Sequence, residues 1–159
     1  MFNRIYAVQS KLLEKIAERK GESTDRDWPL DWERIHMISC AKVGQYLAAR
    51  RGVNTELAAI ACAVHDYGRI LSGKQKNHAV LGYEPVKEFL ISCGYFSEAE
   101  IEIVAQAAKL HSNKSEVGSP LEEVVKDADV LDCFEYGIDP ERPEQRSRLE
   151  NIMAELKSM

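Results

Sequence analysis

The sequence predicts an all-α domain, a helical bundle of about seven helices. Apolar residues recur at helical spacing in nearly every segment, and no stretch shows the two-residue alternation that is typical of strands. Two serine capping boxes, Ser97-Glu98-Ala99-Glu100 and Ser119-Pro120-Leu121-Glu122, mark helix starts in the second half of the chain. The connections between the predicted helices are short, so helices that follow one another are expected to pack together.

The first two predicted helices are separated by a polar stretch. Residues 2–20 carry one apolar stripe, which the polar residues 21–30 end. The next helix is expected to begin at Asp31 as its N-cap and to run to Arg51, with Gly52 as its C-cap. The residues expected to face inward on it are Ile35, Ile38, Val43 and Tyr46.

The next two predicted helices have less regular patterns. Residues 55–67 are apolar on most sides, which predicts a short helix in the middle of the domain, and Gly68 is placed where that helix ends. Residues 77–92 predict a fourth helix, which Pro85 is expected to kink or split.

The last three predicted helices run from Ser97 to about His111, from Ser119 to about Tyr136, and from Ser147 to Met159. The chain shows no internal repeat, no low-complexity linker and no second domain, so residues 1–159 are predicted to form a single domain. The two terminal helices are amphipathic. Such helices either cover the core or pair subunits, and the sequence leaves a homo-oligomer open.

Composition restricts the class of partner. The net charge of −5 argues against duplex nucleic acid as the main partner, but is compatible with a small phosphorylated substrate held by a few local cations. The charged N-terminus and the absence of an apolar run of about 20 residues predict a cytoplasmic protein without a membrane partner. No C-x-x-C pair occurs, so free thiols are expected at Cys40, Cys62, Cys93 and Cys133.

The histidines and one aspartate need a special explanation. His36, His65, His78 and His111 each lie on or at the end of a separate predicted helix, and Asp66 follows His65 at the end of an apolar run. A buried carboxylate is unfavourable without a partner. Imidazole nitrogens and carboxylate oxygens are the ligands of first-row divalent ions, and a helical bundle can direct such ligands to one point. Each residue alone is also compatible with an ordinary hydrogen-bonded side chain.

The segment KDADVLD, residues 126–132, adds three further carboxylates. Asp127 and Asp132 are roughly opposed on the predicted helix, so at least one of them is expected to face water. Asp129, which lies among apolar neighbours, is the aspartate expected to face inward. A solvated acidic helix face is the alternative explanation of this segment.

The joint order of these residues resembles the HD superfamily of metal-dependent phosphohydrolases, which have an all-helical core. The order is a histidine, a His-Asp pair, two single histidines and an aspartate, each group on its own predicted helix. The resemblance covers about residues 30–137. The matching pieces are RIH at 34–36, AVHDYGR at 63–69, NHA at 77–79, LHS at 110–112 and KDADVLD at 126–132.

This resemblance implies a divalent metal site in the core of the bundle. His36, His65, Asp66 and Asp129 match the family's metal ligands, and the resemblance favours Asp129 over Asp127 as the last ligand. The ions to be expected are manganese, iron, nickel, cobalt, magnesium or zinc.

The other two histidines decide whether one or two ions are expected. His78 and His111 match positions that bind a second metal in some HD branches, and that line the pocket and contact phosphate in others. A site with two ions, bridged by Asp66, is therefore one of the two expectations.

The implied reaction is attack of a metal-activated water on a phosphate ester. The transferred phosphoryl group also needs cations around it. Arg69, one turn after His65, and Lys114, three residues after His111, are the candidates, and Asp66 is the third candidate catalytic residue. Lys109 is a poorer candidate, because two helical steps turn it about 200° away from His111.

The leading hypothesis is a phosphohydrolase that acts on a small phosphorylated metabolite, a nucleotide above all. One departure from the family keeps a second hypothesis open. Some HD nucleotidases carry a water-orienting glutamate a few residues after the His-Asp pair, whereas residues 67–72, YGRILS, contain no acid. The second hypothesis is a metal- or nucleotide-binding sensor without hydrolysis, and the third is a di-iron oxygenase, which some HD relatives are.

Overall fold

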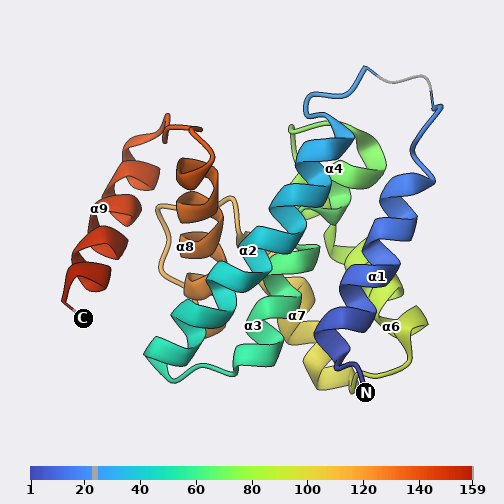
Figure 1. Cartoon of the computed structure of the whole chain (residues 1–159), viewed down its shortest axis with the longest axis horizontal. Coiled ribbons are helices and arrows are strands. Elements are labelled where there is room, and N and C mark those ends of the chain that lie inside the picture. Colours follow the sequence, from blue (N-terminus) through green and yellow to red (C-terminus); the bar gives the residue numbers. More distant parts are fainter. Residues whose placement is uncertain (23–24, 159) are drawn as a thin grey trace.

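The computed structural model describes residues 1–22 and 25–158, and every regular element in these residues is a helix (Figure 1). The helices in this part of the chain are α1 (Arg4–Ala17), α2 (Leu30–Arg51), α3 (Thr55–Val64), α4 (Tyr67–Ser72), α5 (His78–Leu81), α6 (Tyr83–Cys93), α7 (Glu98–Leu110), α8 (Pro120–Glu135) and α9 (Pro143–Lys157). The all-α prediction is confirmed. The helices number nine in the described residues because the predicted helix 77–92 is divided and because α4 follows the predicted helix 55–67 as a separate, unpredicted helix.

Helix α3 forms the centre of the molecule. It packs against α1, α2, α7 and α8, and every residue from Ala58 to Val64 is buried. The close contact between α2 and α3 depends on a glycine of α2. At Gly44, an added Cβ would collide with the sulfur of Cys62 on α3. Figure 1 shows α1 on one side of the α2–α3 pair and α8 with α9 on the other. The predicted position of this helix in the middle of the domain is therefore confirmed.

The chain leaves the helical path at His65 and Asp66, between α3 and α4. The expectation that Gly68 ends a helix is wrong, because Gly68 lies inside α4. A Cβ at this position would collide with the carbonyl oxygen of His78 and would come within 2.9 Å of the Gly82 backbone. The glycine is thus required by the close approach of α4 to α5, and this approach brings His78 next to Asp66.

The predicted helix 77–92 is split, as expected, but at Gly82 and not at Pro85. Pro85 lies in the first turn of α6, where its missing N–H costs no helical hydrogen bond. Asn77, which precedes α5, adopts the left-handed conformation with φ of 58°. This sharp turn directs the short helix α5, and His78 at its start, toward α4.

Helix α2 presents a different face to the core than its apolar pattern predicts. Ile35, Ile38 and Tyr46 are 44%, 41% and 72% exposed, and Val43 is only half-buried, so this prediction is wrong. The buried residues of α2 are Glu33, His36, Met37, Cys40, Ala41, Gly44, Leu47 and Ala48. The buried face of α2 begins with two polar residues, Glu33 and His36. A search for regularly spaced apolar residues therefore does not find this face. The helix also begins at Leu30, after Pro29, and not after an Asp31 cap.

Both predicted capping boxes are present. The Ser97 hydroxyl accepts a hydrogen bond from the N–H of Glu100, and the Ser119 hydroxyl accepts one from the N–H of Glu122. Pro120 takes the first helical position of α8, as predicted. These two helices carry His111, at the end of α7, and Asp129, in the middle of α8.

Helix α9 begins at Pro143, four residues before the predicted start, and it packs against α8 (Figure 1). Its Arg148 donates hydrogen bonds to Glu123 and Asp127 of α8, and to the backbone carbonyls of Lys114 and Glu116. This arginine therefore links α9 to the loop between α7 and α8.

Two smaller predictions concern the cysteines and the chain ends. The four cysteines are free thiols, as expected. Ser23 and Thr24 of the predicted polar stretch, and Met159 of the predicted last helix, lie outside the described residues.

Among the helices within 1–22 and 25–158, none has both the length and the apolar composition that crossing a bilayer requires.

Candidate metal centre

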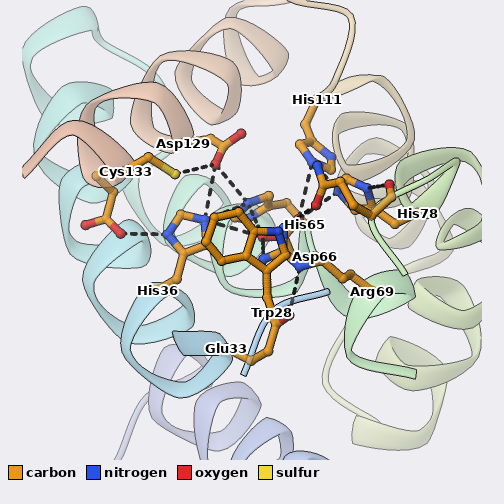
Figure 2. A network of polar contacts seen from close by, with 12 residues as sticks. Trp28, Glu33, His36, His65, Asp66, Arg69, His78, His111, Asp129 and Cys133 are labelled. Carbon is orange, nitrogen blue, oxygen red and sulfur yellow. Dashed lines mark hydrogen bonds and ion pairs between the residues drawn. The ribbon is translucent and has the colours of Figure 1, made fainter. Parts of the chain in front are cut away.

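The predicted ligands meet in a cleft with a volume of about 510 Å³. Five of the six predicted ligands line this cleft: His36, Asp66, His78, His111 and Asp129. The sixth, His65, is 1% exposed and lies behind them. Figure 2 shows all six side chains pointing toward one another, with His65 and Asp66 coming from the link between α3 and α4. The structure thus brings together every residue that the sequence proposes as a ligand.

The first group of ligands joins α2, the end of α3 and α8. The Nε2 atom of His36 lies 3.1 Å from Nε2 of His65 and 3.1 Å from Oδ1 of Asp129. Nε2 of His65 lies 3.1 Å from Oδ2 of Asp66. Because one atom from each of these four residues lies within 4.8 Å of the others, a single cation between them could contact all four.

The second group shares Asp66 with the first. The other carboxylate oxygen of Asp66, Oδ1, lies 2.9 Å from Nε2 of His78 and 3.4 Å from Nε2 of His111. The two Nε2 atoms of these histidines are 3.0 Å apart. Asp66 therefore presents one oxygen to each group, which is the arrangement that a carboxylate bridging two ions would have.

All four histidines are oriented in the same way. Each Nδ1 faces an acceptor outside the cluster, and each Nε2 points inward. The acceptors are Asp132 for His36, at 2.7 Å, the Cys62 carbonyl for His65, the Gln75 carbonyl for His78, at 2.6 Å, and the Ala108 carbonyl for His111, at 2.6 Å. Carbonyl and carboxylate oxygens accept, so Nδ1 of each ring carries a proton, and Nε2 presents a lone pair whenever the ring is neutral. Metal-binding histidines are oriented by the same kind of contact.

The chemistry of this donor set fits a divalent cation. Four imidazole lone pairs and the oxygens of Asp66 and Asp129 converge, and no neutral hydrogen-bonding scheme satisfies two facing lone pairs at 3.0 Å. Mixed nitrogen and oxygen ligands suit first-row divalent ions. The residues that would hold the ions are therefore the six that line or back the cleft.

The charges of the two carboxylates are set by neighbouring cations. Burial alone would raise the pKa of Asp66, but Arg69 and His65 outweigh it and hold the pKa well below its ordinary value of 3.8. Burial would likewise raise the pKa of Asp129, whereas Lys114 and His36 bring it well below the same value. Both groups are thus ionised at neutral pH, as metal ligands must be.

The histidines divide into two kinds. Burial would lower the pKa of His36 and His65, but the neighbouring aspartates raise the pKa of both well above 6.5. For His111, burial dominates and lowers the pKa to about 4. In the metal-free protein, protons therefore compete for the first group of ligands, whereas His111 stays neutral.

The three aspartates of α8 have separate roles. Asp129 faces the cluster, in agreement with the preference for it over Asp127 as the last ligand. Asp127 points away and pairs with Arg148 at 2.9 Å and with Arg51 at 2.8 Å. The expectation that Asp127 or Asp132 faces water is wrong: the two are 8% and 2% exposed. Buried partners, which helical geometry does not reveal, offset the cost of burying both.

Arg69 is largely committed to other side chains. It donates a 2.6 Å hydrogen bond to Oδ2 of Asp66, two to the buried carboxylate of Glu33, and one to Gln75. Its guanidinium group therefore orients Asp66 in this structure, although it also lines the cleft.

Lys114, which the sequence analysis names as a candidate cation for the phosphoryl group, lines the cleft. Its Nζ is 2.7 Å from Oδ2 of Asp129, and it also donates to the carbonyl of His111. Lys109 also lines the cleft. Its Nζ lies 4.9 Å above the centre of the Tyr83 ring.

The sequence analysis missed several residues of the cleft. The Trp32 ring stacks on His36, with centroids 4.9 Å apart and planes at 13°. Trp28 and Arg142 also line the cleft. Trp32 precedes His36 by four residues, and this spacing was an available signal that the two share one face of α2. Trp28 lies before α2 begins, so helical spacing could not have placed it.

Comparisons with known proteins agree with this arrangement. Residues 34–133 match the family model described as HD domain. A ribonuclease Y from Fusobacterium nucleatum subsp. nucleatum is 30% identical over 103 residues, 64% of this chain and 18% of the relative. A ribonuclease Y 2 from Levilactobacillus brevis is 31% identical over 98 residues, 61% of this chain and 17% of the relative. This chain thus spans less than a fifth of either curated relative.

One solved structure resembles the whole fold. It is the crystal structure of a predicted HD superfamily hydrolase from an uncultured Thermotogales bacterium, with a TM-score of 0.59 and 22% identity over 94% of this chain and 89% of that one. At this identity the likeness concerns the fold. The family match, residues 34–133, covers well over half of the chain and includes all six converging ligands. On these grounds the chain belongs to the HD domain family.

Proposed function

We propose that this protein is a metal-dependent phosphohydrolase that cleaves a phosphate ester of a small metabolite, a nucleotide, by means of metal-activated water. The observation that carries the proposal is the pair of ligand groups that share Asp66 at the floor of a cleft. A divalent ion held there would lower the pKa of water and polarise a phosphoryl oxygen.

The residues around the ligands support phosphoryl chemistry. Arg69 holds Asp66 in place through its 2.6 Å hydrogen bond. Lys114, Lys109 and Arg142 line the cleft, and their positive charges suit a phosphate group as it gains negative charge. Their presence agrees with a small anionic substrate, although the protein as a whole is acidic.

The relatives bear on the substrate. Two of them are named ribonucleases, and that name refers to cleavage of RNA. Because this chain corresponds to less than a fifth of each, we propose the shared chemistry, cleavage at a phosphate ester, rather than the same substrate. A substrate panel should include a short single-stranded RNA beside mononucleotides and sugar phosphates.

The test is phosphate release from this panel by purified protein loaded with manganese, cobalt, nickel, iron, magnesium or zinc. We expect His65→Ala and Asp66→Asn to abolish release. Asp31→Asn is the matched control, because the Asp31 side chain is 89% exposed and its ion pair with Arg34 lies at the surface. No release with any metal would contradict the proposal.

Other outcomes of the same measurements would support the alternatives. Tight binding of a nucleotide without turnover would favour a metal- or nucleotide-binding sensor. The commitment of Arg69 to Glu33 and Asp66, which leaves it little capacity to bind phosphate, is the observation that keeps this alternative in view. Bound iron with an optical change on exposure to oxygen would favour a di-iron oxygenase.

A further inference from the structure

Both tryptophans of the protein lie in the cleft of the candidate metal centre. The sequence contains two, Trp28 and Trp32, and each lines the cleft. Their ring centroids are 6.0 Å apart and their planes are tilted by 37°. Figure 2 shows the Trp28 indole next to the ligands and Arg69. We call these two side chains the tryptophan wall.

The tryptophan wall is separate from the hydrophobic core. Neither indole belongs to the cluster of buried apolar residues, or to the partly buried apolar residues that pack against it. Indole is the largest apolar side chain, and its burial in a core is strongly favourable. Its placement beside a cleft rich in charged groups therefore points to a role in binding rather than in folding.

The two indoles differ in how much of their surface is already occupied. Trp32 stacks on His36 and receives Tyr136 in an edge contact, with centroids 5.5 Å apart and planes at 82°. Trp28 is half-buried, and Arg69 lies 5.7 Å from its ring centre. Two aromatic rings of the protein thus already contact Trp32, and Trp28 is the better placed of the two to stack on a ligand.

We propose that the tryptophan wall stacks on a planar aromatic ring of the substrate, so that the protein selects phosphate esters that carry a purine or pyrimidine base. This inference rests on the proposed function, which places the phosphate group at the metal centre. Trp28 contacts the base, and Trp32 fixes the orientation of His36 and forms the rest of the wall. Stacking on indole is tolerant of base identity, so the selection is for nucleotides over sugar phosphates rather than for one base.

The two tryptophans are also direct reporters of this event. Since they account for all the tryptophan in the chain, stacking of a base on the wall should quench the intrinsic tryptophan fluorescence. The probes are adenosine 5′-monophosphate and ribose 5-phosphate, which share the phosphate and the sugar and differ in the base. The metal-loaded protein is read immediately after mixing. We expect quenching by the nucleotide and none by the sugar phosphate.

Variants of Trp28 separate stacking from filling of space. Calorimetric titration should show that Trp28→Leu, which keeps apolar bulk, weakens adenosine 5′-monophosphate binding by about 5- to 100-fold, while Trp28→Phe keeps most of the affinity. Binding of ribose 5-phosphate should change by less than about twofold in both variants, because the phosphate site is intact. Tyr46→Leu is the control, since Tyr46 is an exposed aromatic residue on α2 outside the cleft.

The possible outcomes distinguish this inference from the proposed function. Equal quenching by both probes, equal binding by Trp28→Leu and Trp28→Phe, or equal loss for both probes would overturn the role of the wall. Hydrolysis of nucleotides and sugar phosphates without preference would overturn the wall and leave the phosphohydrolase intact. Trp28-dependent binding of the nucleotide without hydrolysis would support the wall and overturn the phosphohydrolase.

Discussion

The guanidinium group of Arg69 donates a 2.6 Å hydrogen bond to Oδ2 of Asp66, and the same oxygen lies 3.1 Å from Nε2 of His65. A cation that belongs to the protein and a predicted metal ligand thus share one carboxylate oxygen. Arg69 is held in turn by Glu33, with which it forms hydrogen bonds of 2.7 and 3.1 Å. The three side chains are almost fully buried, so the position of Asp66 depends on a chain of paired charges.

Arg69→Met should strongly destabilise the metal-free protein. It would leave the carboxylates of Glu33 and Asp66 buried without their main partner, at a cost of about 3 to 5 kcal/mol in the free energy of unfolding. Urea denaturation with a chelator present measures this loss. Arg34→Met removes a surface ion pair with Asp31 and should cost less than about 1 kcal/mol. A similar small loss for Arg69→Met would contradict the buried chain of charges.

Asp132→Asn should weaken metal binding without removing a ligand. Asp132 accepts the Nδ1–H of His36 at 2.7 Å, and it also accepts from the Ser39 hydroxyl. Loss of such a contact behind a metal-binding histidine typically reduces metal affinity about 10- to 100-fold. Calorimetric titration of the metal-free protein with Mn²⁺ measures it. An unchanged affinity would show that Asp132 does not orient His36.

Metal content should report two ions in the intact protein. Elemental analysis after loading with Mn²⁺ and removal of the excess is the measurement. His78→Ala removes one nitrogen from the second group of ligands only, so the first ion should remain and the second should be lost or bound weakly. His36→Ala should instead affect the first ion. One ion in the intact protein would assign His78 and His111 to phosphate contacts.

The stabilisation caused by metal should increase with pH. The folded-state pKa of His36 and His65 is raised above the ordinary 6.5. Their protonation therefore stabilises the metal-free fold fully below that value, and this contribution is lost as the pH rises through the raised pKa. Metal must displace the same protons, so it binds better at higher pH. Thermal unfolding with Mn²⁺ or with a chelator, at about pH 6 and about pH 8, should show the larger difference at the higher pH.

Gly68→Ala should separate α5 from α4. The added methyl group would collide with the carbonyl of His78 and with the backbone of Gly82, neither of which can move as a flexible side chain does. Overpacking of this kind costs about 1 to 3 kcal/mol. Urea denaturation gives the cost, and metal analysis should show that the second ion is lost before the first. An equal loss of both ions would mean that the damage spreads to the whole centre.

The residues of the metal centre could be predicted because few residue types can form one. The chain has four histidines, and all four converge. Their order along the chain was enough to place them on separate helices. What the sequence could not reveal is the direction of the second nitrogen of each ring. That depends on acceptors such as Asp132, which look from the sequence like surface residues.

The helix boundaries near the centre were harder to predict, because tertiary contacts determine them. The chain bends at His65 and Asp66 within an apolar pattern that looks continuous, and the bend is compatible with the close approach of Gly68 to Gly82. The face of α2 was mistaken for a related reason. Glu33 is buried because it pairs with Arg69, and His36 is buried because it belongs to the ligand cluster. The buried face of α2 is therefore not the face that hydropathy predicts.

The contacts of Arg148 have a practical consequence for anyone who shortens this protein. The matched family segment ends at residue 133, whereas Arg148 lies in α9 and holds the carbonyls of Lys114 and Glu116 at 2.7 and 3.0 Å. Trimming to the matched segment would delete Arg148 and with it the two hydrogen bonds that α9 donates to the loop carrying Lys114. An expression fragment would thus have to retain α9 for the lysine beside Asp129 to keep its place.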